Sequence, residues 1–299
     1  MAQLTRRLLQ TGQRLIAIAG LATLTSSFAV LAVQGATMPA ISAVKQTDTE
    51  STAVGDSFER RFCPEDLTAS FDALVTQSRF RTANWGIAVY WLEQKSWLYT
   101  HNAEQLLVPA SNIKLLTSAA AMQAIAAHTP AAIWDFRDDL NLVNRHSNNA
   151  RADEMLRRIG GQSRVRTMLA PLGVDPASYV QADGSGLSRR NRAQPLAFVA
   201  LLKGMYEADD SGLFYESLPV GGFTGTLSNR FQATAAQGKV HAKTGTLNGV
   251  RALSGYLETE DYGTVIFSII VNQPGQSGRV MLDTIDNMVL LMTQLETCD

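Results

Sequence analysis

Residues 108–117 read VPASNIKLLT and lead directly into an Ala- and Leu-rich stretch. Pro109 and this composition predict a helix over residues 111–127. Side chains three positions apart lie on one face of a helix, so the Lys114 amine can reach the Ser111 hydroxyl. A serine becomes a nucleophile when a neighbouring base takes its proton. Lys114 can be that base where burial, the positive helix end and a second cation lower its pKa. Alone, the spacing also fits an ordinary serine and lysine that face solvent.

A second polar group precedes the helix that we predict over residues 147–159. It reads Ser147-Asn148-Asn149, and such residues usually cap a helix. In the functional interpretation, Ser147 relays a proton while the Asn149 amide holds the lysine and a substrate carbonyl.

A third group, Lys243-Thr244-Gly245-Thr246, ends a predicted strand. Lys243 is either an exposed charge at the sheet edge or a cation for a substrate carboxylate, with the threonine hydroxyls as further donors. Gly245 would let backbone approach a substrate, and the next amide could point at an oxyanion. The tripeptide Gly-Thr-Leu also occurs at residues 225–227, and we interpret the two copies as similar turns.

The remaining segments surround these three groups. Apolar periodicity and turn residues predict helices from Pro64 through Val75 and over residues 162–172, 195–206 and 277–295. They predict strands over residues 85–92, 96–99, 239–243, 251–257 and 264–271. Strands from both ends of the chain would share one antiparallel sheet, with a helical block inserted between them. We therefore expect an α+β fold with an all-helical lobe, in which the first and last helices pack on the same sheet face.

Cys63 and Cys298 lie near the two ends of this predicted body. Neither has a partner at zinc-ligand spacing. If the first and last helices run antiparallel, the two cysteines meet and form a disulfide. Chain-entropy models assign roughly 4 to 5 kcal/mol to a bridge that closes so long a loop. Two unpaired thiols are the alternative.

The N-terminal 35 residues have the features of an export signal. Arginines precede an uncharged apolar stretch at residues 15–33, and the small residues that follow suit cleavage. The stretch is also nearly long enough to span a bilayer, so a retained anchor is the alternative. Residues 36–60 have the composition of a linker, and residues 61–299 form the expected catalytic domain. The domain would be exported, periplasmic or in the cell envelope, where a disulfide persists.

Composition excludes several classes of protein. With 45% hydrophobic and 18% charged residues, the chain is neither collagenous nor of low complexity. A formal net charge of −1 without long basic runs argues against nucleic acid as a partner. Four His and two Cys argue against a multi-metal site, and we expect neither a metal nor another cofactor. His101, His128 and His146 lack the G-x-S-x-G context of a Ser-His-Asp hydrolase.

Three other features have mainly structural interpretations. Trp85, Trp91 and Trp97 are expected to pack in the sheet rather than to form carbohydrate platforms. His241 shares a strand face with Lys243, so it is either an exposed strand residue or part of a cleft rim. Residues 183–186 (Asp-Gly-Ser-Gly) have the composition of a catalytic serine loop, but we interpret them as a tight turn.

The three polar groups together carry more information than each alone. Ser-x-x-Lys, Ser-x-Asn and Lys-Thr-Gly in this order form the signature set of serine penicillin-recognising enzymes. The flanking segments narrow the resemblance; they are residues 108–117, 183–189 (DGSGLSR), 218–227 (LPVGGFTGTL) and 242–249 (AKTGTLNG). Residues 61–295 resemble the D-alanyl-D-alanine carboxypeptidase/endopeptidase family, the class C low-molecular-mass penicillin-binding proteins of the penicillin-binding protein 4 type.

The resemblance implies a penicillin-recognising, β-lactamase-like fold. It implies a serine-type D-Ala-D-Ala carboxypeptidase that acts on peptidoglycan stem peptides through an acyl-serine intermediate and is inhibited by β-lactams. Peripheral or N-terminal association with a membrane is a further expectation. The residues that it assigns are Ser111 as nucleophile, Lys114 as base, Ser147 and Asn149 as the second catalytic element, Lys243, Thr244, Gly245 and Thr246 as substrate-binding residues, and the amides of Ser111 and Thr246 as the oxyanion hole.

The chain departs from the family pattern at one place. Members usually carry two extra domains between the first two motifs, whereas here only residues 115–146 separate them. The departure affects substrate selection more than acylation. Two alternatives remain: a β-lactamase or esterase of the same fold, for which no motif supplies a deacylating base, and a non-catalytic peptidoglycan-binding module, which has no need of Lys114. The sequence does not decide between carboxypeptidase and endopeptidase action.

Overall fold

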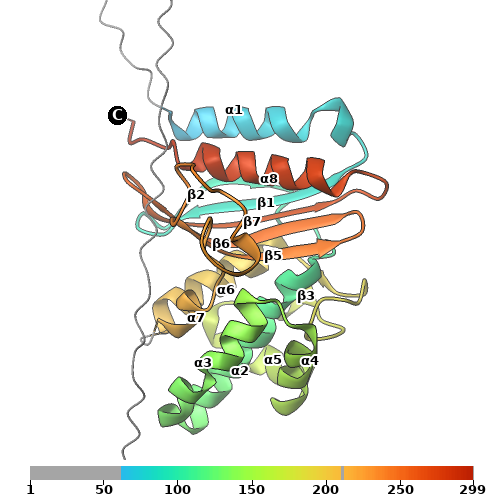
Figure 1. Ribbon diagram of the computed structural model, residues 1–299, viewed down its shortest axis with the longest axis vertical. Helices are drawn as coiled ribbons and strands as arrows, with labels where there is room; N and C mark the ends of the chain where they lie inside the picture. Colours follow the sequence, from blue (N-terminus) through green and yellow to red (C-terminus); the bar gives the residue numbers. More distant parts are fainter. Residues whose placement is uncertain (1–61, 210–211, 299) are drawn as a thin grey trace, which may run out of the picture. The chain divides into compact units, whose positions relative to one another are not determined.

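The computed structural model describes residues 62–209 and 212–298, so the predicted signal and linker at residues 1–60 lie outside the described part. Its main sheet has five strands: β1 (Asn84–Trp91), β2 (Ser96–His101), β5 (Val240–Leu247), β6 (Val250–Thr259) and β7 (Gly263–Asn272). Their order is β2-β1-β7-β6-β5, and every neighbouring pair is antiparallel (Figure 1). The hairpin near the N-terminus therefore pairs with the last strand, which confirms one sheet built from both ends of the chain.

The central strand β7 separates two apolar cores. Phe267 and Ile269 face one core, whereas Ile266 and Ile270 face the other, because successive side chains of a strand point to opposite faces. Helices α1 (Pro64–Val75) and α8 (Gly278–Met292) cover the first face. On the second face lie α2 (Ile113–His128) and α6 (Pro195–Ala208) (Figure 1). The continuous apolar run in β7 thus serves both layers.

The helical block lies between β2 and β5 in the sequence, as predicted. Besides α2 and α6 it contains α3 (Arg137–Leu140), α4 (Asn149–Arg158), α5 (Gln162–Leu169), α7 (Leu213–Glu216), a π-helical turn (Asn141–Arg145) and a small ribbon of β3 (Tyr179–Val180) and β4 (Arg192–Ala193). The sequence did not indicate α3, α7 or the ribbon, because segments of two to four residues are too short to show a period.

A disulfide joins the two ends of the described body. Cys63 and Cys298 are 235 residues apart, and their Cα atoms lie 5.8 Å from each other. A β-bridge between Phe62 and Leu295 also places the start of α1 beside the end of α8. The predicted bridge is therefore confirmed, and two unpaired thiols are excluded. Within residues 62–209 and 212–298, no helix combines the length and apolarity that crossing a membrane requires.

Strand β5 is longer than predicted. It extends to Leu247 and pairs with β6 throughout, so residues 243–246 lie inside the strand instead of closing it. Glycine and threonine suggested a turn, but the actual turn is at Asn248 and Gly249, where Gly249 has a φ of 70°. By contrast, residues 225–227 form a short 3-10 turn. The interpretation of the two Gly-Thr-Leu copies as similar turns was therefore wrong.

Candidate active site

Ser111 and Lys114 lie together at the start of α2. Ser111 is part of a 3-10 turn (Ala110–Asn112) that runs into the helix. The Lys114 Nζ lies 3.0 Å from the Ser111 Oγ. The structure therefore brings the two side chains into hydrogen-bond contact, at the spacing that the sequence suggested.

The Lys114 amine is buried among neutral groups. Besides Ser111, it contacts the Asn149 Oδ1 at 2.7 Å and the Ser185 carbonyl oxygen at 2.5 Å, and its side chain is fully buried. Burial lowers the pKa of Lys114 to about 8, against the opposing effect of the Asp153 and Asp183 charges. At pH 7 about a tenth of such amines are neutral, so Lys114 can accept the Ser111 proton.

The three residues of the second polar group, Ser147, Asn148 and Asn149, have different roles in the structure. Asn148 is the N-cap of α4, and its side chain accepts a hydrogen bond from the Arg151 amide at 2.9 Å. The helix therefore begins at Asn149, two residues later than predicted. Ser147 adopts a left-handed φ of 56°, which is uncommon outside glycine. Because Asn148 supplies the cap, the side chains of Ser147 and Asn149 can contact the two lysines of the site.

Lys243 lies on β5 and is completely buried. Its Nζ donates to the Ser147 Oγ at 2.9 Å and to the Thr244 carbonyl at 3.0 Å. Burial lowers the pKa of Lys243 well below its usual range, and the positive charge of Lys114 lowers it further. The Lys243 amine therefore lies behind Ser147 and the strand backbone, and it is not exposed at the sheet edge.

The free edge of β5 faces the turn that carries Ser111. A Cβ on Gly245 would lie 2.5 Å from the Pro109 carbonyl oxygen, so only glycine permits this approach. Ala242 donates its amide to Pro219, away from β6. Amides two positions apart point to the same side of a strand, so the Thr246 amide also faces this edge. The structure thus places the Thr246 amide on the side of Ser111.

The loop that follows β3 supports the same turn. Asp183 accepts hydrogen bonds from the amides of Gly186 at 2.6 Å and Ser188 at 2.7 Å. Gly186 has a φ of 86°, and a Cβ there would lie 2.0 Å from the Ala110 carbonyl oxygen. The loop also supplies the Ser185 carbonyl to Lys114. The predicted turn at residues 183–186 is thus part of a compact loop beneath the serine.

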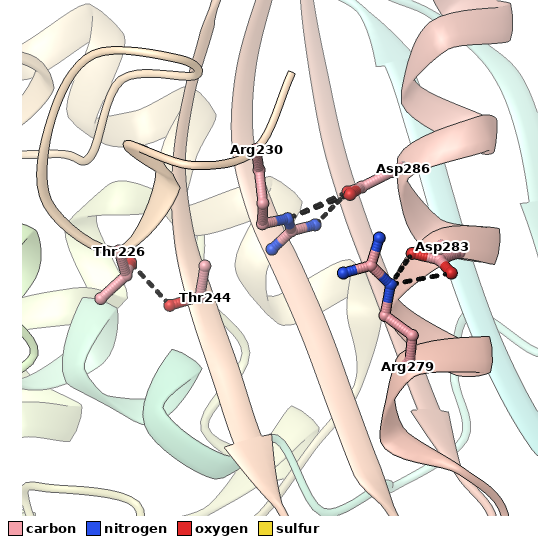
Figure 2. A network of polar contacts seen from close by, with 6 residues as sticks. All are labelled: Thr226, Arg230, Thr244, Arg279, Asp283 and Asp286. Atoms are coloured by element: carbon pink, nitrogen blue, oxygen red, sulfur yellow. Dashed lines mark hydrogen bonds and ion pairs between the residues drawn. The ribbon is translucent and has the colours of Figure 1, made fainter. Parts of the chain in front are cut away.

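A cavity of about 230 Å³ opens beside Ser111. Its lining residues come from six segments of the chain and are Ser111, Ser147, Thr226, Arg230, Thr244, Gly245, Thr246, Arg251, Ala252, Leu282 and Ile285. The Thr244 hydroxyl donates a hydrogen bond to the Thr226 Oγ1 at 2.7 Å (Figure 2).

Sequence reasoning missed three polar residues of this cavity. For Thr226, the repeated Gly-Thr-Leu was a usable signal. Arg230 and Arg251 carried none, because single arginines on separate segments have no diagnostic spacing.

His241 and the tryptophans have packing roles. His241 is half-buried and stacks on Tyr215 at 4.2 Å between ring centroids. It neither lines the cavity nor stands exposed on its strand, so both interpretations of this residue were wrong. Trp85 is buried in the sheet core and Trp91 packs at its margin, as expected. Trp97 contacts Tyr90 edge-on but stays 49% exposed.

The comparison with protein families gives one match over most of the chain. The sequence model of the D-Ala-D-Ala carboxypeptidase 3 (S13) family matches residues 67–130 and 123–295. Among curated proteins, the chain is 36% identical over 188 residues to a D-alanyl-D-alanine carboxypeptidase of Actinomadura sp. (strain R39), covering 58% of this chain and 34% of that protein. It is 33% identical over 174 residues to penicillin-sensitive carboxypeptidase A of Dictyostelium discoideum, covering 52% of this chain and 33% of that protein.

Solved structures show the same fold at lower identity. Penicillin binding protein 4 (dacB) from Haemophilus influenzae superimposes with a TM-score of 0.67 at 14% identity, over 75% of this chain and 99% of that one. The TLA-3 extended-spectrum beta-lactamase superimposes with a TM-score of 0.64 at 16% identity, over 77% of this chain and 98% of that one. The expected β-lactamase-like fold is therefore confirmed. The chain spans about a third of the length of the curated relatives that it matches.

Proposed function

This chain belongs to the D-Ala-D-Ala carboxypeptidase 3 (S13) family, and on that premise we propose that it is a serine-type D-Ala-D-Ala carboxypeptidase. It would act on peptidoglycan stem peptides through an acyl-serine intermediate, with β-lactams as inhibitors. The observation that carries the proposal is the buried Lys114 amine, 3.0 Å from the Ser111 hydroxyl. A module that only binds peptidoglycan needs no such base.

The acylation step follows from the site. Neutral Lys114 takes the proton of Ser111, and the Ser111 Oγ attacks the carbonyl carbon of the penultimate D-alanine. The amides of Ser111 and Thr246 stabilise the oxyanion, at about 3 to 4 kcal/mol for each donor. Asn149, which contacts Lys114 at 2.7 Å, keeps the amine directed at the serine.

The nitrogen of the leaving D-alanine needs a proton before it can depart. Ser147 relays to the leaving nitrogen the proton that Lys114 took from Ser111, which leaves Lys114 neutral again. Lys243, 2.9 Å from the Ser147 Oγ, holds that hydroxyl in place. Thr244 and Thr246 offer hydroxyl groups to the terminal carboxylate. Water then releases the acyl group. A β-lactam would acylate Ser111 in the same way, with its ring carboxylate at the threonines.

The surroundings of the serine support slow deacylation of a β-lactam. Among the described residues, none that lines the cavity is a carboxylate. Asp153 and Asp183, which act on Lys114 from nearby, already accept backbone amides of the loop at residues 183–188. A fast β-lactamase needs a base that activates water at the acyl-serine, so we favour the peptidase over that alternative.

The cellular location is part of the proposal. Peptidoglycan lies outside the cytoplasm, and the Cys63–Cys298 disulfide is of the kind that persists in oxidising compartments. We propose that residues 61–299 form the catalytic domain of an exported protein of the periplasm or cell envelope. Whether residues 1–35 are cleaved or hold the protein at a membrane stays a prediction.

Labelling with a fluorescent penicillin tests the proposal. The wild-type chain should form a stable adduct, Ser111→Ala should form none, and Ser163→Ala, an exposed serine of α5, should label like wild type. Rapid loss of the label would favour a β-lactamase, and absence of labelling a binding module. Release of D-alanine from a muropeptide then tests the carboxypeptidase activity, and its absence would reject that activity.

A further inference from the structure

The cavity continues beyond the threonines of β5 into a pocket on the α8 face of the sheet. Thr246 pairs with Arg251 across the β5–β6 ladder, and directly paired residues project their side chains from the same face. Leu282 and Ile285 of α8 form the apolar wall of this part of the cavity. We call the space between Arg251 and this apolar wall the far pocket.

Two arginines line the far pocket, but only one carries an unbalanced charge. The Arg230 Nε contacts the two carboxylate oxygens of Asp286 at 3.1 and 3.2 Å (Figure 2). Arg279 on the same helix pairs with Asp283. Arg251 has no carboxylate partner in the part of the chain that the structure describes. The far pocket is therefore positively charged, with Arg251 as the source.

Arg251 is held in place by its surroundings. Its Nη1 donates to the carbonyls of Leu247 at 2.9 Å and Val250 at 2.7 Å. The start of α8 packs on the other side of the guanidinium, where a Cβ on Gly278 would lie 1.8 Å from the Arg251 Nη2. The guanidinium is thus positioned before any ligand arrives, which reduces the entropy lost on binding.

Burial and the charge of Arg230 both lower the pKa of Arg251, yet a guanidinium remains protonated in proteins. An anion in the far pocket would therefore be attracted by a permanent charge. Lys243 cannot provide a direct contact of this kind, because it is completely buried and does not line the cavity.

The size and chemistry of the far pocket define a ligand. A volume of about 230 Å³ for the whole cavity is below the roughly 300–1,000 Å³ of ordinary ligand pockets. The apolar wall suits a methyl group, and the arginine suits a carboxylate. We propose that Arg251 binds the free α-carboxylate of the leaving D-alanine in the far pocket, so that this enzyme removes a C-terminal residue and does not cut within a cross-link. The inference rests on the proposed function and specifies its substrate.

The test compares two substrates that differ only at the C-terminus. Diacetyl-L-Lys-D-Ala-D-Ala and its C-terminal carboxamide are offered separately, and release of D-alanine or D-alaninamide is measured as kcat/KM. Wild type should prefer the free acid. In Arg251→Gln that preference should fall by about 10- to 100-fold, the loss expected for one charge-assisted hydrogen bond. Arg251→Lys keeps the charge and should retain the preference to within about tenfold of wild type.

Arg279→Gln is the matched control, because it removes an arginine from the same region that does not line the cavity. It should leave the preference unchanged. A wild type that cleaves both substrates equally, or an Arg251→Gln variant with unchanged preference, overturns the inference and leaves the proposed function intact. A wild type that cleaves neither substrate rejects the proposed function as well. If Arg251→Gln does not fold, Arg251→Met takes its place, and an unchanged preference for the free acid in that variant overturns the inference.

Discussion

Lys114 is a buried amine whose contacts are a hydroxyl, an amide oxygen and a backbone carbonyl. None of these partners carries a charge, so they do little to offset the loss of water around an ammonium. The carboxylates of Asp153 and Asp183 act on it, but the effect of burial is larger and the pKa falls to about 8. The choice of an amide at position 149 therefore keeps the base usable near neutral pH.

Replacing Asn149 by Asp should move the pH dependence of acylation. A carboxylate in contact with Lys114 stabilises the ammonium, so the midpoint of the rate should rise from about 8 by about 1 to 3 pH units. The rate of penicillin labelling between pH 6 and 11 measures it. Asn148→Asp is the control, because aspartate caps a helix as well as asparagine does, and its midpoint should stay at that of wild type. An unshifted midpoint in Asn149→Asp contradicts the role of Lys114 as base.

At the scale of elements, the site depends on three contacts between segments. The loop at residues 183–188 packs beneath the turn of Ser111, β5 packs beside it, and the cap of α4 brings Ser147 and Asn149 to the lysines. Two of the three contacts require a glycine, because backbone approaches backbone there. Helix α2 alone therefore does not make the site.

Replacing Gly186 by Ala should abolish penicillin labelling. The new Cβ would lie 2.0 Å from the Ala110 carbonyl oxygen, and the residue has a φ of 86°. Gly275→Ala is the matched control, because it has a φ of 84° but open space around its Cβ. The control should lose about 1 to 2 kcal/mol of unfolding free energy from the left-handed conformation and should keep its labelling. Labelling and urea unfolding of both variants check this, and equal behaviour would contradict the proposed support of Ser111 by the loop.

At the scale of the whole described body, a disulfide joins its two ends. The hairpin β1–β2 and the strands β5–β7 come from opposite ends of this body, and the helical lobe lies between them in sequence. Unfolding must therefore separate segments that are far apart along the chain. The Cys63–Cys298 bridge limits that separation.

Removing the bridge should destabilise the protein without changing its site. For a sequence separation of 235 residues, the chain-entropy model assigns about 5 kcal/mol to the disulfide. The double variant Cys63→Ser/Cys298→Ser should lose up to that amount in urea unfolding and keep penicillin labelling at 25 °C, because neither cysteine lines the cavity. A reductant should lower the urea midpoint of wild type and leave the double variant unchanged. An equal midpoint for both proteins would argue against a stabilising bridge.

The sequence by itself determined the elements and the pairs that are close along the chain. The apolar run at residues 264–271 predicts a strand, and the three-residue spacing of Ser111 and Lys114 places both on one helix face. These features depend on backbone geometry that repeats over a few residues. The terminal bridge was also accessible, because the order of elements brings the first and last helices to one face.

Only the tertiary structure decided how the charges of the site behave. That Lys243 is buried behind Ser147, that β5 continues through Gly245, and that Arg251 reaches the cavity follow from the packing of β5, β6, α4 and α8 on one another. Burial and proximity are properties of segments brought together from distant parts of the chain. No periodic pattern in the sequence indicates burial or proximity of this kind, so the sequence did not predict the far pocket.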